Sequence, residues 1–167
     1  MTDTIRIARE EDLGRILELY ARARVRMAEN GNPNQWGTSW PEEWKVREDM
    51  ENRRLYVICR GDTIRGVFCL LSGGDPTYRQ IEGGWHSDCS YCAIHRIAGE
   101  GGGIFAAAVE YAERFWPYLR VDTHEKNTAM RRAILRQGFS YCGMIRAEDG
   151  TLRLAFDRLR ENGISDR

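Results

Sequence analysis

Residues 91–105 read YCAIHRIAGEGGGIF, in which a strand-like run passes directly into a turn with four glycines and then into an apolar helix pattern. Glycines between the end of a strand and the start of a helix let backbone N–H groups approach an anion closely. The N-terminus of the helix adds about half a positive charge at the same place. The stretch therefore predicts a cradle for a phosphate-bearing ligand around Gly101, Gly102 and Gly103.

The segments on either side of this stretch predict one α/β domain that covers residues 1–167. Strand patterns precede it as a meander, and a strand, a short helix and a final hairpin follow it. A chain of this length buries roughly two-thirds of its unfolded surface without disulfides or metals. The expected strands are residues 4–7, 55–60, 63–71, 91–98, 119–122, 139–145 and 151–156, and the expected helices begin near residues 13, 41, 104 and 127.

The balance of charge argues against several classes of function. Lys plus Arg and Asp plus Glu both number 25, so the formal net charge is zero, whereas a nucleic-acid-binding protein usually carries a basic excess. No run of about 18 apolar residues is present. The first residues are polar and acidic, where a signal peptide has a basic and then an apolar stretch. We therefore expect a cytoplasmic protein, a monomer or a homodimer, that binds neither nucleic acid nor membrane.

The cysteines and histidines predict no metal site. The chain has five cysteines, an odd number, scattered through apolar surroundings, which is typical of reduced and buried thiols. His86, Cys89, Cys92 and His95 recur at every third position, and on a helix they would partly share one face. Residues 91–98 have a strand pattern, however, in which an odd spacing places successive side chains on opposite faces.

Two kinds of phosphate ligand fit the glycine turn. Residues 101–106, GGGIFA, match the dinucleotide-binding fingerprint with alanine as the third small residue, and Asp122 ends the next strand as a ribose-binding acid would. Dinucleotide folds begin with the strand before the turn, whereas about ninety residues precede that strand here. Coenzyme A is the other candidate, and a dinucleotide-dependent enzyme stays as a third hypothesis for the function.

Several short motifs favour coenzyme A because of their order and spacing. They are residues 5–13 (IRIAREEDL), Gln35-Trp36 before Trp40-Pro41, the hairpin at 62–68, residues 91–98, residues 119–124 (LRVDTH), Asn127, and residues 138–145. Together they cover nearly the whole chain. In this combination they resemble the GNAT superfamily of acyl-CoA-dependent N-acetyltransferases.

The resemblance implies a twisted, mixed, mostly antiparallel sheet of about six to seven strands with flanking helices, whose central strands splay apart to admit the pantetheine arm of acetyl-CoA. It implies that backbone groups of Ile97 and Gly99 pair with the pantetheine and that turn amides hold the pyrophosphate. Asn127 would reach the cofactor across the gap, although asparagine is also a favoured helix N-cap. The implied cofactor-binding residues are Ile97, Ala98, Gly99, Gly101, Gly102, Gly103, Ile104 and Asn127.

The chain departs from the family's pattern at three positions. Glu100 stands where the turn usually has Gln or Arg, and Phe105 stands where a small residue is usual. A carboxylate repels a pyrophosphate, so we expect Glu100 to point away from the ligand. Many members of the family have a tyrosine seven residues after the asparagine as a general acid, and here that position is Ile134.

Acetyl transfer requires a neutral amine, yet an alkyl amine with a pKa of about 10 is only about one part in a thousand neutral at pH 7. The resemblance therefore implies a general base. The residues that could act as this base are Glu82, His86, His95, Asp122 and His124. Of these we select Glu82 and His124 as the candidate bases. His124 follows the expected strand 119–122, where the central strands would splay apart. Tyr141 is the candidate for an acid that protonates the leaving thiolate.

The acceptor is expected to bind between loops rich in aromatic residues. Trp36, Trp85 and Tyr78 lie in these loops and indicate an acceptor pocket. We expect an N-acetyltransferase that moves an acetyl group from acetyl-CoA to a primary amine of a small molecule or peptide, by direct attack in a ternary complex and without a metal. The alternative is a catalytically silent acyl-CoA-binding or sensor domain, because the turn departs from the pattern and the usual tyrosine is missing.

Overall fold

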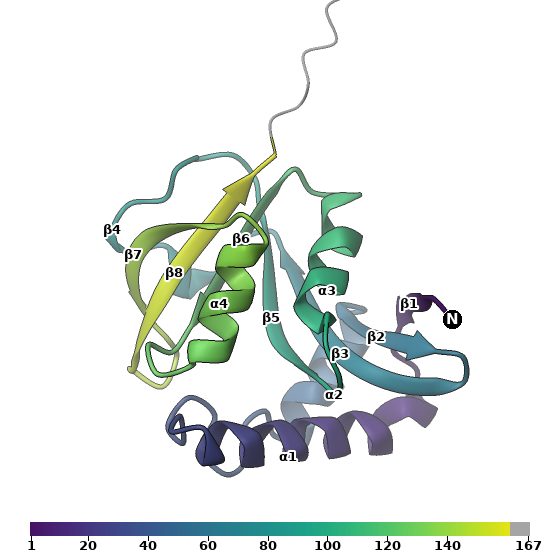
Figure 1. Ribbon diagram of the computed structural model, residues 1–167. Helices are drawn as coiled ribbons and strands as arrows, with labels where there is room; N and C mark the ends of the chain where they lie inside the picture. The colour runs from purple at the N-terminus through teal and green to yellow at the C-terminus, as the bar shows by residue number, and fades with distance from the viewer. Residues whose placement is uncertain (161–167) are drawn as a thin grey trace, which may run out of the picture.

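An eight-stranded mixed sheet is the framework of the fold (Figure 1). We describe residues 1–160 of a computed structural model. The strands lie in the order β1-β2-β3-β5-β6-β8-β7-β4. Their bounds are β1 (Asp3–Ile7), β2 (Leu55–Arg60), β3 (Thr63–Ser72), β4 (Glu82–Gly83), β5 (Cys92–Gly99), β6 (Tyr118–Thr123), β7 (Ser140–Arg146) and β8 (Leu152–Leu159). The helices are α1 (Leu13–Glu29), α2 (Glu43–Glu51), α3 (Ile104–Glu113) and α4 (Thr128–Arg136), with short 3-10 turns η1 (Glu10–Asp12) and η2 (Pro76–Tyr78).

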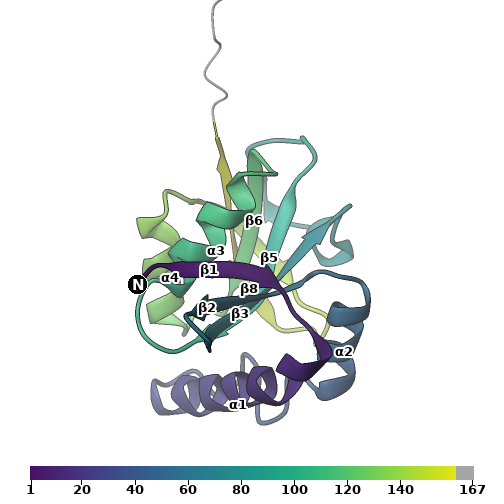
Figure 2. The same cartoon turned by 90° about the vertical axis from the view of Figure 1, so that its right-hand side faces the viewer.

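Both faces of the sheet are covered by helices because the strands are apolar on both sides. In β2, Leu55 and Val57 belong to the core beneath α1 and α2, while Ile58 belongs to the core beneath α3 and α4. Alternation of this kind follows from the two-residue period of a strand. Figure 2 shows α1 below the first strands, with β1 crossing in front of them. In Figure 1, α3 and α4 lie in front of the sheet.

A gap opens between the central strands β5 and β6. They form the parallel pair of the sheet, and their pairing is confined to Cys92 with Leu119 and Ala93 with Arg120. Beyond these residues β5 continues to pair with β3, and β6 continues to pair with β8. The two halves of the sheet therefore splay apart past Ala93 and Arg120, which confirms the expected mixed, mostly antiparallel sheet with splayed central strands.

A bulge in β5 lies at the start of this gap. Arg96 has a φ of 47°, and the pairing with β3 shifts there: Cys69 pairs with His95, but Val67 pairs with Ala98. A bulge redirects the side chains that follow it. His95 consequently packs against Tyr78 on one face of the sheet, whereas Ile97 packs into the core with α3 and α4 on the other.

The structure differs from the expected strand number because of β4. This strand has two residues, Glu82 and Gly83, which pair with Met144 and Gly143 of β7. Two residues are too few to show an alternating pattern, so the sequence did not predict a strand there. The predicted domain also includes residues 161–167, which lie outside the described residues.

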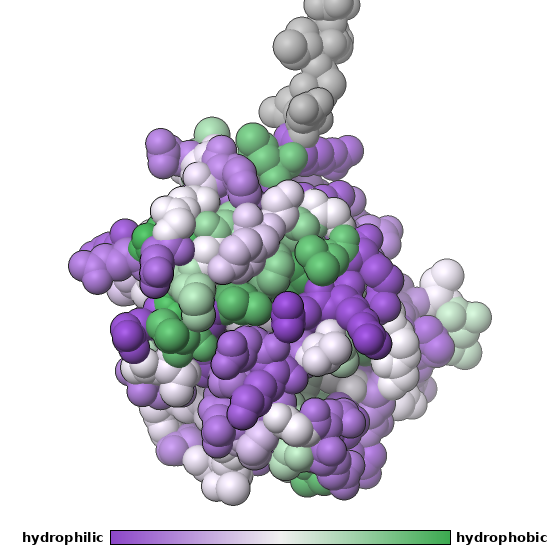
Figure 3. Space-filling model, turned by 60° about the vertical axis from the view of Figure 1, so that its left-hand side comes forward, coloured by the Kyte–Doolittle hydropathy of each residue, from purple (hydrophilic) through white to green (hydrophobic). Residues whose placement is uncertain are grey.

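The surface is mixed in character. Figure 3 shows one face on which hydrophobic residues gather in the upper half among hydrophilic ones. Within residues 1–160, no helix combines the length and the apolar character that crossing a bilayer requires.

Candidate functional site

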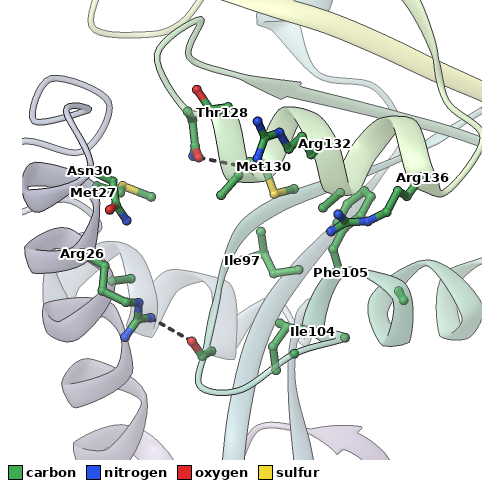
Figure 4. A pocket seen from close by; sticks show the side chains of 18 of the residues that line it. Arg26, Met27, Asn30, Ile97, Ile104, Phe105, Thr128, Met130, Arg132 and Arg136 are labelled. Carbon is green, nitrogen blue, oxygen red and sulfur yellow. Dashed lines mark hydrogen bonds between the residues drawn. The ribbon is translucent and has the colours of Figure 1, made fainter.

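A groove of about 850 Å³ runs between the glycine turn, α1 and α4 (Figure 4). Its walls come from segments that are far apart in the sequence. They are residues of α1 and the segment after it (Ala23, Arg26, Met27, Asn30, Asn32), of β5, the turn and α3 (Ile97, Gly99, Gly101, Gly102, Gly103, Ile104, Phe105, Ala106), and of the α4 region (Lys126, Asn127, Thr128, Ala129, Met130, Arg132, Ala133, Arg136, Gln137).

The glycine turn can take its shape only with glycine at certain positions. Gly103 immediately precedes α3 with a φ of 79°, in the left-handed region that favours glycine. A Cβ on Gly99 would lie 2.8 Å from the backbone oxygen of Arg65 and 2.6 Å from the side chain of Ile104. The Arg65 guanidinium also donates to the carbonyls of Glu100 and Gly102, at 3.2 and 3.0 Å, and so fixes the turn to β3.

The start of α3 offers hydrogen-bond donors to the groove. The first backbone N–H groups of a helix have no partner within the helix, and no side chain caps this end of α3. Ile104, Phe105 and Ala106 of this first turn line the groove. The turn and the helix start therefore form the backbone cradle for an anion that the sequence predicted.

Positive side chains surround the cradle. Arg26, Lys126, Arg132 and Arg136 line the groove, and none of its lining residues within the described chain is acidic. Figure 4 shows Arg26 reaching from α1 to the turn, where it donates to the Gly99 carbonyl at 2.8 Å. Arg132 and Arg136 are four residues apart on α4, so they share one side of that helix. The groove suits a ligand with several phosphates.

Glu100 faces α1. Its carboxylate accepts a hydrogen bond from Arg15 at 2.9 Å and another from Arg22. The bond from Arg15 and then that from Arg22 lower the pKa of Glu100 from its ordinary value. Phe105 likewise leaves the turn open, because its ring is buried against Phe139 in the core. Both departures from the family's pattern thus point away from the cradle.

Asn127 caps α4 and also lines the groove. Its Oδ1 accepts from the Met130 N–H at 3.1 Å, and its Nδ2 donates to Gln35 Oε1 at 3.0 Å. The capping role considered from the sequence is present. A contact of Asn127 with a cofactor stays a prediction.

The groove gathers the predicted cofactor-binding residues with the exception of Ala98, which is buried in the core beneath α1. Sequence reasoning missed the arginines Arg26, Arg132 and Arg136. The four-residue spacing of Arg132 and Arg136 indicates a shared positive face on one helix. No feature of the sequence near Arg26 indicated that α1 lies beside the glycine turn. The neighbouring Arg131 donates to the Glu125 carbonyl and does not line the groove.

The three residues singled out for catalysis lie apart from one another. Glu82 is exposed on β4, three strands from β6 and thus roughly 14 Å away. Tyr141 is half-exposed on β7, with its ring against Phe156. His124 is buried directly after β6, and its Nδ1 accepts the Lys126 N–H at 3.1 Å.

Of these three, His124 is nearest in sequence to the splay, but its hydrogen bond occupies the lone pair that a base needs. A neutral imidazole with Nδ1 as acceptor carries its proton on Nε2. Burial also lowers the pKa of His124. The catalytic roles of His124, Tyr141 and Glu82 stay predictions.

The predicted aromatic residues separate into two groups. Tyr78 and Trp85 touch each other, with ring centroids 4.9 Å apart, and the indole N–H of Trp85 donates to the Tyr78 carbonyl. Trp36 packs against Tyr20 of α1 at 5.7 Å. Tyr78 also lies against His95, at 5.6 Å between ring centroids. The pair formed by Tyr78 and Trp85 is therefore the part of the predicted pocket that reaches the splay.

The regularly spaced histidines and cysteines do not converge. Cys92 is buried in the core with α3, and His95 binds Asp75 on the opposite face. His86 instead lies beside Asp157 and Cys142, with 2.7 Å between His86 Nδ1 and Asp157 Oδ1 and 3.4 Å between His86 Nδ1 and Cys142 Sγ.

Solved structures that superpose on this chain include acetyltransferases of the GNAT family. No protein-family model matches the chain, and no curated protein matches it by sequence. An acetyltransferase of the GNAT family from Streptococcus agalactiae 2603 superposes with a TM-score of 0.86 and 27% identity, over 95% of this chain and 96% of that one. A putative acetyltransferase from Salmonella typhimurium, solved with its cofactor acetyl-CoA, superposes with a TM-score of 0.64 and 13% identity over 100% and 99% of the two chains. The protein therefore has the GNAT acetyltransferase fold, as its sequence motifs predicted.

Proposed function

We propose that this protein transfers an acetyl group from acetyl-CoA to a primary amine of a small molecule or peptide, by direct attack in a ternary complex. The observation that carries the proposal is the groove, in which a backbone cradle and four cationic side chains meet at the end of the gap between β5 and β6. Such a site fits a long ligand with phosphates at one end.

The residues of the groove suggest how acetyl-CoA, the acetyl donor, is held. The start of α3 and the turn supply N–H groups for the pyrophosphate, and Arg26, Lys126, Arg132 and Arg136 supply positive charge for the phosphates. Along the edge of β5 that faces β6, backbone groups beyond Ala93 have no strand partner in the described residues. The Arg96 and Gly99 carbonyls among them accept from Tyr20 and Arg26. The others can pair with the pantetheine amides and donate to the thioester oxygen.

Transfer then needs little beyond positioning and removal of a proton. The amine nitrogen forms a bond to the thioester carbon, the carbon–sulfur bond breaks, and coenzyme A leaves as a thiol. A thioester is already activated toward amines, so the proposed reaction uses no metal. We place the reaction in the cytoplasm, where the five free cysteines would stay reduced.

The test is turnover with a panel of primary amines, followed by the release of free thiol from acetyl-CoA, together with calorimetric titration of acetyl-CoA. Thiol release that depends on the amine supports the proposal. Binding of acetyl-CoA without turnover of any amine would favour the silent sensor domain, and binding of NAD(H) in its place would favour the dinucleotide enzyme. Absence of acetyl-CoA binding would overturn the proposal.

A further inference from the structure

His95 and Asp122 face each other at the point where the sheet opens. The last paired residues of β5 and β6 are Ala93 and Arg120, and side chains two residues apart lie on the same face of a strand. His95 and Asp122 are therefore the first side chains past the pairing on that face. Their nearest atoms, His95 Nδ1 and Asp122 Oδ2, are 3.8 Å apart.

Asp75 fixes the orientation of the His95 ring. The distance from His95 Nε2 to Asp75 Oδ2 is 2.7 Å, and an ionised carboxylate only accepts hydrogen bonds. Nε2 therefore carries a proton, and in the neutral ring the lone pair is on Nδ1, which faces Asp122. The Thr77 N–H and hydroxyl also donate to Asp75, at 2.8 and 2.7 Å. Burial would raise the pKa of Asp75, but the bonds from His95 and Thr77 hold that pKa at about 2.

The gap between His95 and Asp122 thus has a hydrogen-bond acceptor on each side. Two acceptors 3.8 Å apart can both accept from one group that sits beside the pair, and an ammonium group carries three N–H donors. The Tyr78 hydroxyl donates to Asp122 Oδ2 at 2.7 Å, and no partner occupies the other oxygen of this carboxylate within the described residues. Both side chains, His95 and Asp122, are 16% exposed, so the site is shielded but reachable.

The bulge at Arg96 sets the position of His95 relative to the thioester of bound acetyl-CoA. It puts His95 on the face that Tyr78 covers and Ile97, which lines the groove, on the opposite face. Two residues of strand span about 7 Å. An amine beside His95 and a thioester at Ile97 would therefore meet through the gap between β5 and β6.

We propose that His95 is the base that takes the proton of the acceptor amine and that Asp122 holds this amine as an ammonium ion, so that the acceptor is a cationic alkyl amine. The inference rests on the proposed function. Asp75 is a positioning residue that keeps the His95 lone pair directed at the amine. The titratable groups that surround His95 are Asp75, Asp122, Tyr78 and the β3 residue opposite it, Cys69.

The ammonium group gives one proton to His95 Nδ1, and the neutral nitrogen forms a bond to the thioester carbon. As the carbon–sulfur bond breaks, a second N–H proton is lost and the leaving thiolate is protonated. His95 returns its proton to water. One ammonium ion and one thioester thus give one amide, one thiol and one released proton.

The experiment compares His95→Gln with His86→Gln. His86 is a matched control, because it also pairs with a carboxylate at 2.7 Å but lies on the loop before β5. Acetyl-CoA binding is measured by calorimetry and turnover by thiol release, with putrescine as the cationic probe and glycine as an amine that carries a carboxylate. We expect His95→Gln to bind acetyl-CoA within about threefold of wild type but to lose on the order of a hundredfold or more in kcat. His86→Gln should stay within about twofold.

Two further readouts separate a base from a structural histidine. The kcat of the wild type should rise with pH to a plateau, whereas His95→Gln should lack the plateau and climb toward the alkaline range in which the amine itself becomes neutral. Asp122→Asn should raise KM for putrescine more than it lowers kcat. It should also reduce the ratio of kcat/KM for putrescine to kcat/KM for glycine. This measurement remains informative even if His95→Gln fails to fold.

The outcomes distinguish the two proposals. If wild type turns over no amine, the proposed function fails. If wild type turns over putrescine but His95→Gln keeps its rate and pH profile, the role of His95 is overturned and the proposed function stands. An unchanged preference for putrescine over glycine in Asp122→Asn overturns the ammonium site.

Discussion

The Glu100 carboxylate accepts a hydrogen bond from Arg15 at 2.9 Å, so the acidic residue within the glycine turn is held by α1. A second bond comes from Arg22 of the same helix. The turn carries a carboxylate at a position where the family usually has Gln or Arg, and α1 supplies the two arginines that neutralise it. Without them Glu100 would be free to turn toward the cradle and repel an anion.

The first prediction concerns the neutralisation of Glu100 by Arg15 and Arg22. The double variant Arg15→Ala with Arg22→Ala should bind acetyl-CoA about three- to tenfold more weakly at low salt, because an unpaired carboxylate then lies beside the pyrophosphate site. Calorimetric titration measures the change. Adding Glu100→Gln to the double variant should restore most of the affinity. If the triple variant binds as weakly as the double, the arginines act through their own charge and not through Glu100.

The second prediction concerns the shape of the turn. Gly99→Ala should lower the free energy of unfolding by about 1–3 kcal/mol, since its Cβ would lie 2.8 Å from the Arg65 carbonyl oxygen. Gly102→Ala is the matched control, because a Cβ there meets nothing within 4 Å and its φ is not in the left-handed region. Urea unfolding should place Gly102→Ala within about 0.5 kcal/mol of wild type. Equal losses in the two variants would contradict the role assigned to Gly99.

The third prediction separates two adjacent arginines of α4. Arg132 lines the groove, whereas the Arg131 guanidinium donates to the Glu125 carbonyl at 3.0 Å. Arg132→Gln should weaken acetyl-CoA binding about three- to tenfold and reduce its dependence on salt, because a charge near the phosphates is lost. Arg131→Gln should bind within about twofold of wild type. A larger effect at Arg131 would show that the phosphates lie on another side of α4.

The sequence predicted those parts of the site that are continuous in the chain. The strand, the glycine turn and the start of α3 are consecutive, so their joint geometry follows from local rules on glycine and helix termini. Asn127 was recognisable both as a helix cap and as a groove residue. The fold followed from the order of such motifs.

The parts that sequence reasoning missed depend on contacts between distant segments. Asp75 and His95 are twenty positions apart, and a loop and a 3-10 turn bring them together. The face of His95 was undetermined because the bulge at Arg96 breaks the two-residue period of the strand. Glu82 and Tyr141 were plausible by residue type alone, but the strand order places them on or beside the far edge of the sheet.

The last prediction uses the paired carboxylate of Asp75. Its folded-state pKa of about 2 lies below the ordinary value of 3.8, so ionised Asp75 stabilises the fold above about pH 4, and this stabilisation is lost as pH falls toward 2. A shift of this size corresponds to about 2 kcal/mol. Asp75→Asn should therefore be less stable than wild type by about that amount at pH 6 in urea unfolding. The difference should shrink as the pH is lowered from about 4 to 2, because wild type then carries a neutral side chain as well. A difference that stays constant over this range would mean that Asp75 contributes through packing and not through its charge.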